Sequence, residues 1–518
     1  MSEKKGTEGN QGNLGKLPKG WVWTRLEDVA DVIRGISFPK EARTNTPQDD
    51  YVACLRTTNV QREVEWENLW FVPRQYVRRQ EQFVQPHDIL ISTANSLELV
   101  GKVAEVKAIP FVASIGAFIS TIRVSQELEP RFVYFQLTST EIQSALRETA
   151  STTTNISNIS TTSVLNTDLK IAPLPEQQRI VAKIEELFSD LDAGVAALQK
   201  TKTELKRYRQ AVLKAAVEGK LTAEWRAANA GKVESADKLL ERIRAERAKS
   251  GKGAEARGSK GEINAAELPA LPEGWCWARL DDVSTINPRI DLQVMTDDLD
   301  VTFLPMRCVE EETGQLDLSL IRKITEVRKG YTYFTNGDLL FAKITPCMEN
   351  GKVAIAHDLR NGIGFGSTEF HVIRLPGFLP RRFFFYFLLR EELRKEARRN
   401  MTGSAGQLRV PANFMQQTPV ALPPLAEQQQ IVAEVERHLS VAEQVEKTVD
   451  ASLKQAERLR QSILRQAFAG KLVPQDPGDE SAERLLERIR ARKETRENKT
   501  QEAETSKPKQ RTKESKAK

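Results

Sequence analysis

Cysteine is scarce in this chain of 518 residues. The four cysteines (Cys54, Cys276, Cys308 and Cys347) form no C-x-x-C pair, which argues against a disulfide framework or a zinc site. The polar stretch 1–16 lacks the apolar segment of a signal peptide, and no apolar run is long enough to cross a bilayer. We therefore expect a cytoplasmic protein with reduced thiols and no membrane contact.

Histidine is equally rare, and the four histidines have no metal-ligand spacing among themselves. The glycine-rich motifs that bind dinucleotides or ATP are missing. The Asn-Pro-Pro-aromatic tetrapeptide of methyl transfer is missing too, since Asn287-Pro288-Arg289 does not match it. The residues therefore show no constellation that argues for catalysis, for a metal site or for a nucleotide cofactor.

Positive charge is unevenly placed. The net charge is +6, and residues 490–518 alone hold eleven Lys/Arg against five Asp/Glu, which is also +6. The rest of the chain is therefore neutral overall, so global charge is poor evidence for a nucleic-acid surface. The tail has almost no apolar residues and is expected to be disordered.

Two sequence motifs occur twice. Leu174-Pro-Glu-Gln-Gln-Arg-Ile-Val181 returns as Leu425-Ala-Glu-Gln-Gln-Gln-Ile-Val432, and each copy leads to Gly-Lys-Leu at the same distance. Leu-Pro-x-Gly-Trp-x-Trp begins at Leu17 and again at Leu271. The chain is thus a tandem duplication in which a module and a long helix occur twice.

Each long helix is predicted from its ends and its apolar period. Pro175 suits a first helical turn, and Gly219 and Gly470 suit a left-handed C-terminal cap. Between them apolar residues recur every seven positions, as in a coiled-coil seam: Ile184, Leu191, Leu198, Leu205 and Val212, then Val435, Ala442, Val449, Ala456 and Ile463. We expect the two helices to pack on each other; the alternative is that each packs only on its own module.

Within the modules only framework pieces recur. Asp88-Ile-Leu matches Asp338-Leu-Leu, whereas the segments between such pieces differ. Residues 111–124 and 365–375 are predicted to be strands, and 130–147 and 380–399 helical. Short amphipathic helices are expected from Ser235 and from Ser481. A shared framework with unlike loops suggests two sites of one kind that differ in specificity.

Two polar loops precede the long helices, at 152–161 and 402–410. Their hydroxyls, amides and glycines are groups that contact base edges and phosphates. An ordinary polar turn explains the same composition, and composition by itself favours it.

The repeated motifs resemble those of the specificity subunits of type I restriction–modification systems, over about residues 17–491. The resemblance implies an α+β fold. It has two tandem mixed α/β target recognition domains, separated by two long helices that form an antiparallel coiled coil with pseudo-two-fold symmetry. Expected segments are a disordered N-terminus (1–16), target recognition domain 1 (17–173), long helix 1 (174–221), a short amphipathic helix and flexible linker (222–270), target recognition domain 2 (271–424), long helix 2 (425–472), a short amphipathic helix (473–491) and a basic disordered tail (492–518).

The resemblance also implies the function. Each domain would read one half of an asymmetric, bipartite site in double-stranded DNA, and the helices would set the spacer between the halves. The chain would have no catalytic centre and would recruit two methylation subunits and two restriction subunits. Those partners would use S-adenosylmethionine, ATP and Mg, so this chain would bind no cofactor.

Candidate DNA contacts are carried over residue by residue. The loop at 402–410 resembles the family's Thr-Gly-Ser-x-Gly-Gln-x-Arg-Val pattern, which points to Ser404, Gln407 and Arg409. Gln suits adenine and Arg suits guanine. The matching loop of the first module departs from the glycine pattern and offers Thr154, Asn155, Ser157 and Asn158. Lys102 and Lys352 are candidate phosphate contacts, for which a hairpin turn with a solvated lysine is an equal alternative, and Arg56 and Arg307 are candidates with less support.

Two alternatives stay open at this point. One is a fused modification enzyme whose methyl-transfer motifs have diverged. The other is a coiled-coil scaffold without any DNA function.

Overall fold

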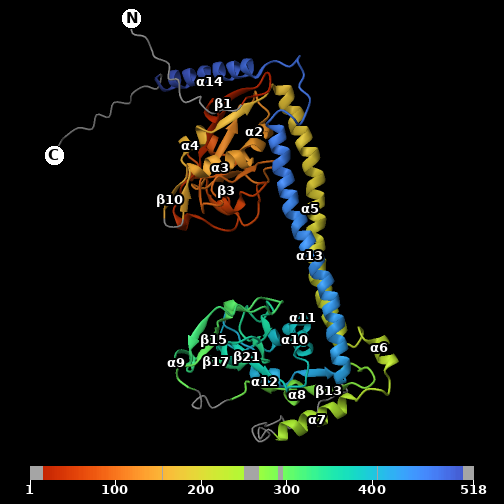
Figure 1. The fold of residues 1–518 in the computed structure, drawn as a ribbon. Coiled ribbons are helices and arrows are strands. Elements are labelled where there is room, and N and C mark those ends of the chain that lie inside the picture. The colour runs from red at the N-terminus through yellow and green to blue at the C-terminus, as the bar shows by residue number, and fades with distance from the viewer. Residues whose placement is uncertain (1–15, 154–155, 250–267, 290–295, 405, 506–518) are drawn as a thin grey trace, which may run out of the picture. The chain divides into compact units, whose positions relative to one another are not determined.

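The computed structural model describes residues 16–153, 156–249, 268–289, 296–404 and 406–505. The chain divides into two compact units, drawn in Figure 1: unit 1 is residues 1–197 and 452–518, and unit 2 is residues 198–451. Both boundaries fall inside the long helices α5 (Leu174–Val217) and α13 (Leu425–Ala467). Each unit therefore contains one module and a part of each long helix.

Unit 1 is built on an antiparallel sheet in the order β2-β9-β5-β7, next to a sheet β4-β3-β8 in which β3 and β8 run parallel. Smaller sheets pair β1 with β12 and β10 with β11 and β6. The elements are β1 (Val22–Arg25), α1 (Leu26–Val29), β2 (Ala30–Arg34), β3 (Tyr51–Leu55), β4 (Trp70–Pro73), β5 (Ile89–Ser92), β6 (Ala94–Asn95), β7 (Val103–Glu105), β8 (Ala113–Ile115), β9 (Ile119–Val124), α2 (Pro130–Leu137), α3 (Thr140–Glu148), β10 (Ser151–Thr153), β11 (Ile156–Asn158), α4 (Thr161–Leu165), β12 (Asp168–Ile171) and α14 (Ala482–Thr505).

Unit 2 repeats the two main sheets, the second with a fourth strand, and it pairs β13 with β22 as unit 1 pairs β1 with β12. Its antiparallel sheet has the order β14-β21-β18-β19, and in the sheet β16-β15-β20-β17 the strands β15 and β20 run parallel. The elements are α6 (Ala223–Ala228), α7 (Ala236–Lys249), β13 (Cys276–Arg279), α8 (Leu280–Val283), β14 (Thr285–Ile286), β15 (Asp300–Leu304), β16 (Ile321–Lys323), α9 (Ile324–Val327), β17 (Thr332–Thr335), β18 (Leu339–Ala342), β19 (Val353–Ile355), β20 (Ile363–Gly366), β21 (Phe370–Arg374), α10 (Arg381–Leu389), α11 (Glu391–Arg399), α12 (Ala412–Gln417) and β22 (Pro419–Leu422).

Some predicted elements are divided in the structure. The helical stretch 130–147 forms α2 and α3, because Ser139 leaves the helix and its Oγ accepts from the backbone N–H of Ile142 at the start of α3. The stretch 380–399 forms α10 and α11, which meet at the extended residue Arg390. Likewise 111–124 forms β8 and β9, and 365–375 spans parts of β20 and β21.

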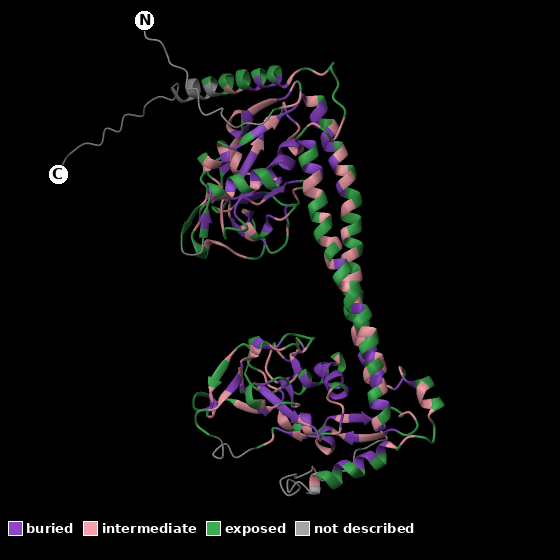
Figure 2. Cartoon of the chain, in the orientation of Figure 1, coloured by how far each residue is buried: buried purple, intermediate pink, exposed green. Residues whose placement is uncertain are grey.

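The core of each unit joins its module to both long helices. In unit 1, Phe132 of α2 packs edge-on against Trp21 and against Phe468, which follows α13. Figure 2 shows the central strands and α2 and α10 buried, whereas the long helices carry exposed faces. Among the described residues, no helix is both long and apolar enough to span a membrane.

A buried carboxylate starts each long helix. In unit 2, Glu427 is 1% exposed and accepts from Thr222 Oγ1 at 2.7 Å, Arg226 Nε at 2.9 Å and Trp275 Nε1 at 2.8 Å. Trp275 belongs to the module's opening motif, and Thr222 and Arg226 follow the end of α5. The Glu of the repeated motif therefore joins the start of α13, the segment after α5 and the module's opening motif. The sequence indicated only a favourable charge at the start of the helix.

Unit 1 has the corresponding arrangement. Glu176 is 1% exposed, and Gln475, which follows the end of α13, donates from Nε2 to its Oε1 at 3.4 Å. Burial raises the pKa of the Glu176 carboxyl. One turn later, Arg179 pairs with Asp479 at 2.7 Å. The start of each long helix thus contacts the segment that follows the end of the other.

The predicted glycine caps have the same geometry in both units. Gly219 (φ 68°) and Gly470 (φ 65°) adopt the left-handed conformation, and the next residues, Lys220 and Lys471, donate to carbonyls five residues earlier. A Cβ on Gly470 would lie 2.4 Å from Cγ of Pro18. The Gly-Lys-Leu end and the Leu-Pro opening recur together because they pack against each other.

The framework motifs Asp88-Ile-Leu and Asp338-Leu-Leu begin with equivalent buried ion pairs. Arg123 of β9 binds both carboxylate oxygens of Asp88, at 2.8 and 2.7 Å. Arg374 of β21 binds Asp338 in the same way, at 2.7 and 2.5 Å. Each carboxylate is 2% exposed or less, so these pairs fix the central strands of both sheets.

The seam residues are buried or half-buried. Ile184 and Ile463 lie in the core of unit 1, Val212 and Val435 lie in the core of unit 2, and Val449 is 5% exposed. Leu191, Leu198 and Leu205 are half-buried. In unit 2, α5 and α13 are also joined by Lys202–Asp450, Arg209–Glu446 and a hydrogen bond between Tyr208 and His438.

The C-terminal helix departs from the expected disordered tail at 492–518. Helix α14 continues to Thr505, beyond the amphipathic segment predicted to end at 491, and residues 506–518 lie outside the described residues. Its extension is held by side-chain contacts to α1 and β2, in which Lys493 donates to the carbonyl of Glu27 and Arg496 pairs with Asp31 at 3.0 Å. Counting charge alone missed this, because the cations have acidic and carbonyl partners on the module.

Helix α14 docks on unit 1 as α7 docks on unit 2. The N–H of Ala482 donates to Gly20 O at 3.0 Å, and that of Ala236 donates to Gly274 O at 2.9 Å. The predicted amphipathic helices therefore pack on this chain, each against the opening motif of a module.

We expect Glu427→Ala to lower the free energy of unfolding of unit 2 by about 3 kcal/mol, since it leaves buried donors unpaired. The matched control is Glu436→Ala on the same helix, whose exposed pair with Arg382 contributes less than about 1 kcal/mol. Thermal and urea unfolding of the full chain measure both variants. Equal losses for the two would contradict this assignment.

Candidate nucleic-acid interface

The two predicted loops occupy the same place in their modules. After strand β5, Thr93 accepts from Ile159 N at 2.9 Å and donates to Phe118 O at 2.9 Å. After strand β18, Lys343 accepts from Val410 N at 2.8 Å and donates to Glu369 O at 2.9 Å. By these backbone contacts, Phe118 of unit 1 is equivalent to Glu369 of unit 2. Asn158 and Arg409 are equivalent too, because each comes one residue before the residue whose N–H makes the contact.

In unit 1 the loop is the hairpin β10–β11, which extends a sheet through β6. Of the predicted contacts, Asn158 is exposed, whereas Ser157 is 1% exposed and its hydroxyl bonds to that of Thr152 at 2.9 Å. Ser157 thus stabilises the hairpin and does not face solvent. Thr154 and Asn155 lie outside the described residues.

In unit 2 the loop is a hairpin closed by two hydrogen bonds between Thr402 and Arg409, at 3.0 and 2.8 Å. Gln407 N donates to Ser404 O at 3.0 Å inside it. The side chains of Ser404 and Gln407 are exposed, which places both predicted contacts where a ligand can reach them.

Arg409 has a partner within the module. Its Nε lies 3.0 Å from Oε2 of Glu369, its Nη2 lies 2.9 Å from Oε1, and its Nη1 donates to Gln407 O at 3.0 Å. The hydrogen bond and charge of Glu369 raise the pKa of Arg409. The side chain is still 40% exposed, so the carboxylate orients the guanidinium and leaves part of it open to a base or phosphate.

Lys343 is a residue that the sequence analysis missed. It is half-buried beside Glu369 and Arg409, and burial lowers the pKa of its ammonium group. The signal in the sequence was its position directly after the framework strand β18, where unit 1 has Thr93 after β5. Lys343 adds a second cation at the base of the unit 2 hairpin.

The remaining predicted cations lie in other hollows. In unit 1, Arg56 donates to Asn68 O and its guanidinium lies 4.5 Å from the ring centre of Trp70, in a cavity of about 480 Å³. In unit 2, Lys352 donates to Met306 O at 3.2 Å and shares a cavity of about 600 Å³ with the exposed Arg307. Neither cavity is lined by hairpin residues.

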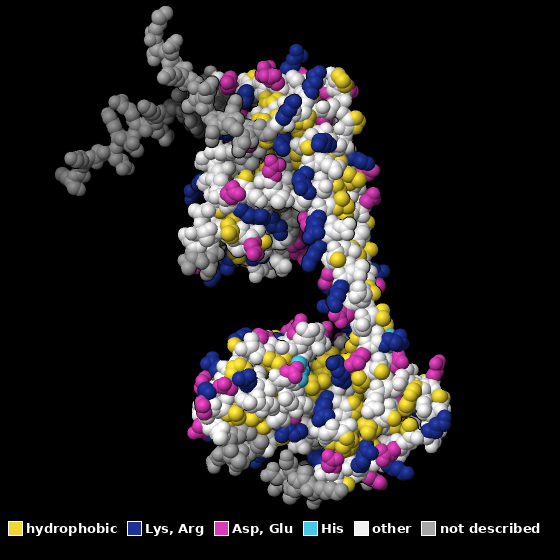
Figure 3. Space-filling model, in the orientation of Figure 1, with side chains coloured by type: hydrophobic (Ala, Val, Ile, Leu, Met, Phe, Trp, Pro, Cys, Tyr) yellow, Lys and Arg dark blue, Asp and Glu magenta, His cyan; other side chains and the backbone are white. Residues whose placement is uncertain are grey.

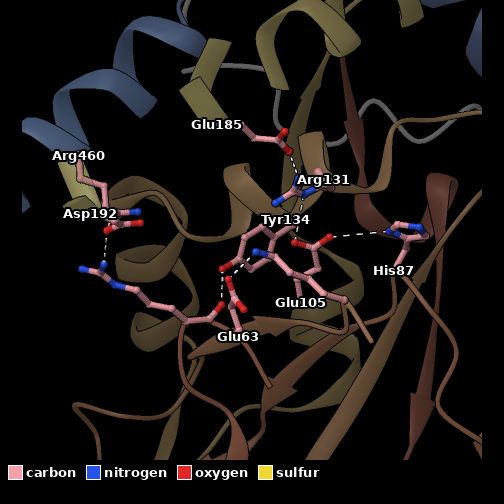
Figure 4. A network of polar contacts seen from close by, with 10 residues as sticks. Glu63, His87, Glu105, Arg131, Tyr134, Glu185, Asp192 and Arg460 are labelled. Atoms are coloured by element: carbon pink, nitrogen blue, oxygen red, sulfur yellow. Dashed lines mark hydrogen bonds and ion pairs between the residues drawn. The ribbon is translucent and has the colours of Figure 1, made fainter. Parts of the chain in front are cut away.

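Lys102 lies in a cavity of about 730 Å³ in unit 1 that also contains a network of ion pairs. Its Nζ donates to Gln61 Oε1, and burial lowers its pKa. In Figure 4, Arg131 lies between Glu105 and Glu185, and Arg460 lies beside Asp192.

The network joins the module to the parts of α5 and α13 in unit 1. Arg62 bridges Asp192 of α5 and Glu457 of α13, each at 3.1 Å, and its carbonyl accepts from Tyr134 of α2 at 2.6 Å. Burial raises the pKa of Tyr134 to about 12, so the hydroxyl stays a donor at neutral pH. Ion pairs connect the module to both long helices here, so this hollow is a structural junction, and no described residue of the hairpin lines it.

On the face shown in Figure 3, basic and acidic side chains are interspersed, with no stripe of one sign. Within the described residues, no group of three or more His, Cys, Asp or Glu is arranged to hold a metal ion. The hairpins expose polar groups, and in unit 2 one of them carries the oriented guanidinium of Arg409.

Comparisons with known proteins identify the family. The family described as "Type I restriction modification DNA specificity domain" matches residues 18–207 and 272–455. The StySPI specificity subunit of a type I restriction enzyme from Salmonella potsdam is 30% identical, over 92% of this chain and 96% of that protein. The EcoAI specificity subunit from Escherichia coli is 35% identical over 55% of each chain, so this match spans about half of that relative.

A solved structure from work on complex assembly and conformational transition of the type I R-M system shares the fold. Its TM-score is 0.58 at 19% identity, and the match covers 88% of this chain and 100% of that one. The family match covers both modules, and the full-length relative agrees with it. The chain therefore belongs to the family of type I restriction modification DNA specificity domain proteins.

Proposed function

We propose that this chain is the DNA-specificity subunit of a type I restriction–modification complex and that it is not itself catalytic. Each module reads one half of an asymmetric, bipartite site in double-stranded DNA. The observation that carries the proposal is that one framework presents different side chains at matched hairpin positions, Asn158 in unit 1 and Arg409 in unit 2. Two copies of one reader with different contacts recognise two different half-sites.

The proposal assigns the reactions to partner subunits. Two methylation subunits use S-adenosylmethionine, two restriction subunits use ATP and Mg, and this chain binds none of these cofactors. Because DNA is its ligand, we place the chain in the cytoplasm. The relatives named as specificity subunits support this division of labour.

We further propose that α5 and α13 pair as an antiparallel coiled coil that sets the spacer between the half-sites. The cores of the separate units support it. In unit 1 the start of α5 packs with the end of α13, as Ile184 and Ile463 show, whereas in unit 2 the end of α5 packs with the start of α13, as Val212 and Val435 show. Because the start of one helix packs with the end of the other in each unit, an antiparallel pair is favoured.

Methylation-site sequencing tests the function directly. A host that expresses the chain with its methylation subunit is expected to gain modified adenines in a split motif with a fixed unspecified gap. The host with the methylation subunit alone is the control. The proposal fails if the two subunits co-purify and yet no chain-dependent modification appears.

For the unit 2 reader, we expect Arg409→Ala to weaken binding of the assembled complex by about tenfold, the lower range for a bidentate base contact. The loss should relax the sequence requirement at one position of one half-site. Arg382→Ala is the control, since Arg382, near the start of α10, forms an exposed pair with Glu436 of α13. Binding to duplexes with single base changes measures the effect, and a uniform loss across all sequences would identify Arg409 as a phosphate contact.

For the ruler, we expect that duplicating one heptad in both helices, residues 198–204 and 445–451, lengthens the spacer by about 3 base pairs. Seven helical residues add about 10 Å, and each base pair rises about 3.4 Å. Both half-sites should stay intact. Duplication in one helix alone is the control, because it puts the two seams out of register. An unchanged spacer in the double variant would refute the proposal that the helices set the spacer.

A further inference from the structure

Phe118 is the most exposed large hydrophobic side chain among the described residues, at 62%. It lies in the turn between β8 and β9, and its carbonyl accepts from the N–H groups of Thr93 and Ala94, at 2.9 and 3.3 Å. Ala94 pairs directly with Asn158 of the hairpin. The turn that carries Phe118 is therefore joined by backbone hydrogen bonds to β6, the strand that pairs with the proposed base contact of unit 1.

A second apolar residue faces solvent on this hairpin. Along β11 the side chains alternate, so that Ile156 and Asn158 are exposed and Ser157 is buried. Ile156 is 48% exposed. An isoleucine and an asparagine thus share the outward face of a strand whose neighbour β6 is hydrogen-bonded to the turn of Phe118.

The equivalent surface of unit 2 is polar. The backbone position of Phe118 is taken there by Glu369, which binds Arg409, and that of Ile156 is taken by the exposed Gln407. One framework therefore presents a carboxylate–guanidinium pair in one module and an aromatic ring with an aliphatic side chain in the other. No core packing accounts for the apolar pair, because both side chains are exposed.

An exposed cation is connected to both the turn of Phe118 and the segment after the hairpin. Arg34 pairs with Ser120, two residues after Phe118, in the register of β2 and β9. Its side chain is exposed, and its Nε donates to Thr161 Oγ1 at 2.8 Å, three residues after Asn158. A guanidinium beside exposed apolar and amide groups is the combination that meets a phosphate at the rim of a groove and base edges inside it.

We propose that Phe118 and Ile156 form an apolar contact for the 5-methyl group of a thymine in the major groove of the unit 1 half-site. The thymine methyl is the one apolar group that base pairs present in that groove, and phenylalanine is among the side chains that contact it. Asn158 reads a neighbouring polar edge, and Arg34 binds the adjacent phosphate. The inference rests on the proposed function, whose half-site it makes specific.

The test replaces each thymine of the recognised duplex in turn with deoxyuridine, which removes only the methyl group. Binding is measured for the full chain assembled with its methylation subunit. For the natural chain, we expect deoxyuridine at one position of the unit 1 half-site to weaken binding about fourfold, which is the effect of losing one buried methyl group. Phe118→Ala should bind the thymine duplex more weakly and should lose its sensitivity at that position.

Val112→Ala is the matched control. Val112 is 57% exposed in the same unit and lies at the opposite end of β8 from Phe118. It should keep the deoxyuridine effect of the natural chain, and thermal unfolding checks that both variants are folded.

Sequence-specific binding without any sensitive thymine would overturn the methyl contact and leave the proposed function standing. Retained sensitivity in Phe118→Ala would also overturn it. If Phe118→Ala instead failed to assemble with the methylation subunit, the surface would be a protein contact, and the proposal would be wrong. Absence of sequence-specific binding by the natural assembly would count against the proposed function itself.

Discussion

The buried carboxylate at the start of each long helix is the interaction on which the rest of the structure depends. Glu427 accepts hydrogen bonds from the opening tryptophan of its module and from the segment that follows α5. A buried charge is stable only when such donors surround it. The module, the start of one helix and the end of the other are thereby held together in unit 2, and Glu176 has the corresponding place in unit 1.

This constraint explains why the repeated motifs are short and widely separated. The tryptophan opening, the Glu-Gln-Gln helix start and the Gly-Lys-Leu helix end are far apart in the sequence, but they contact one another in each unit. Their side chains cannot change independently. The exposed hairpin residues Asn158 and Gln407 carry no such constraint, because the contacts that place the hairpins on the framework are made by main-chain groups. The contrast between Phe118 and Glu369 shows how far the surface chemistry differs on one framework.

Some residues of the candidate site could be predicted from the sequence, and others could not. The loop pattern located Gln407 and Arg409 on an exposed hairpin, although the pairing of Arg409 with Glu369 joins residues forty positions apart and was invisible. Lys102 was selected for its position after a glycine, but in the structure it faces Gln61 in a junction of paired charges. The sequence did not predict that Phe118 is exposed, since an isolated aromatic residue in a predicted strand is normally buried. Only the fold exposes it, in a turn between two strands.

The sequence by itself determined the duplicated architecture, the two long helices with their glycine ends and the family, because these depend on local propensity and on exact repetition along the chain. Only the tertiary structure decided the partners of the motif residues, the docking of α14 on the first module and the side chains that the hairpins expose. The physical reason is that burial and ion pairing are made between segments distant in sequence. Charge counting therefore predicted a disordered tail, where Lys493 and Arg496 have partners near the N-terminus of the described chain.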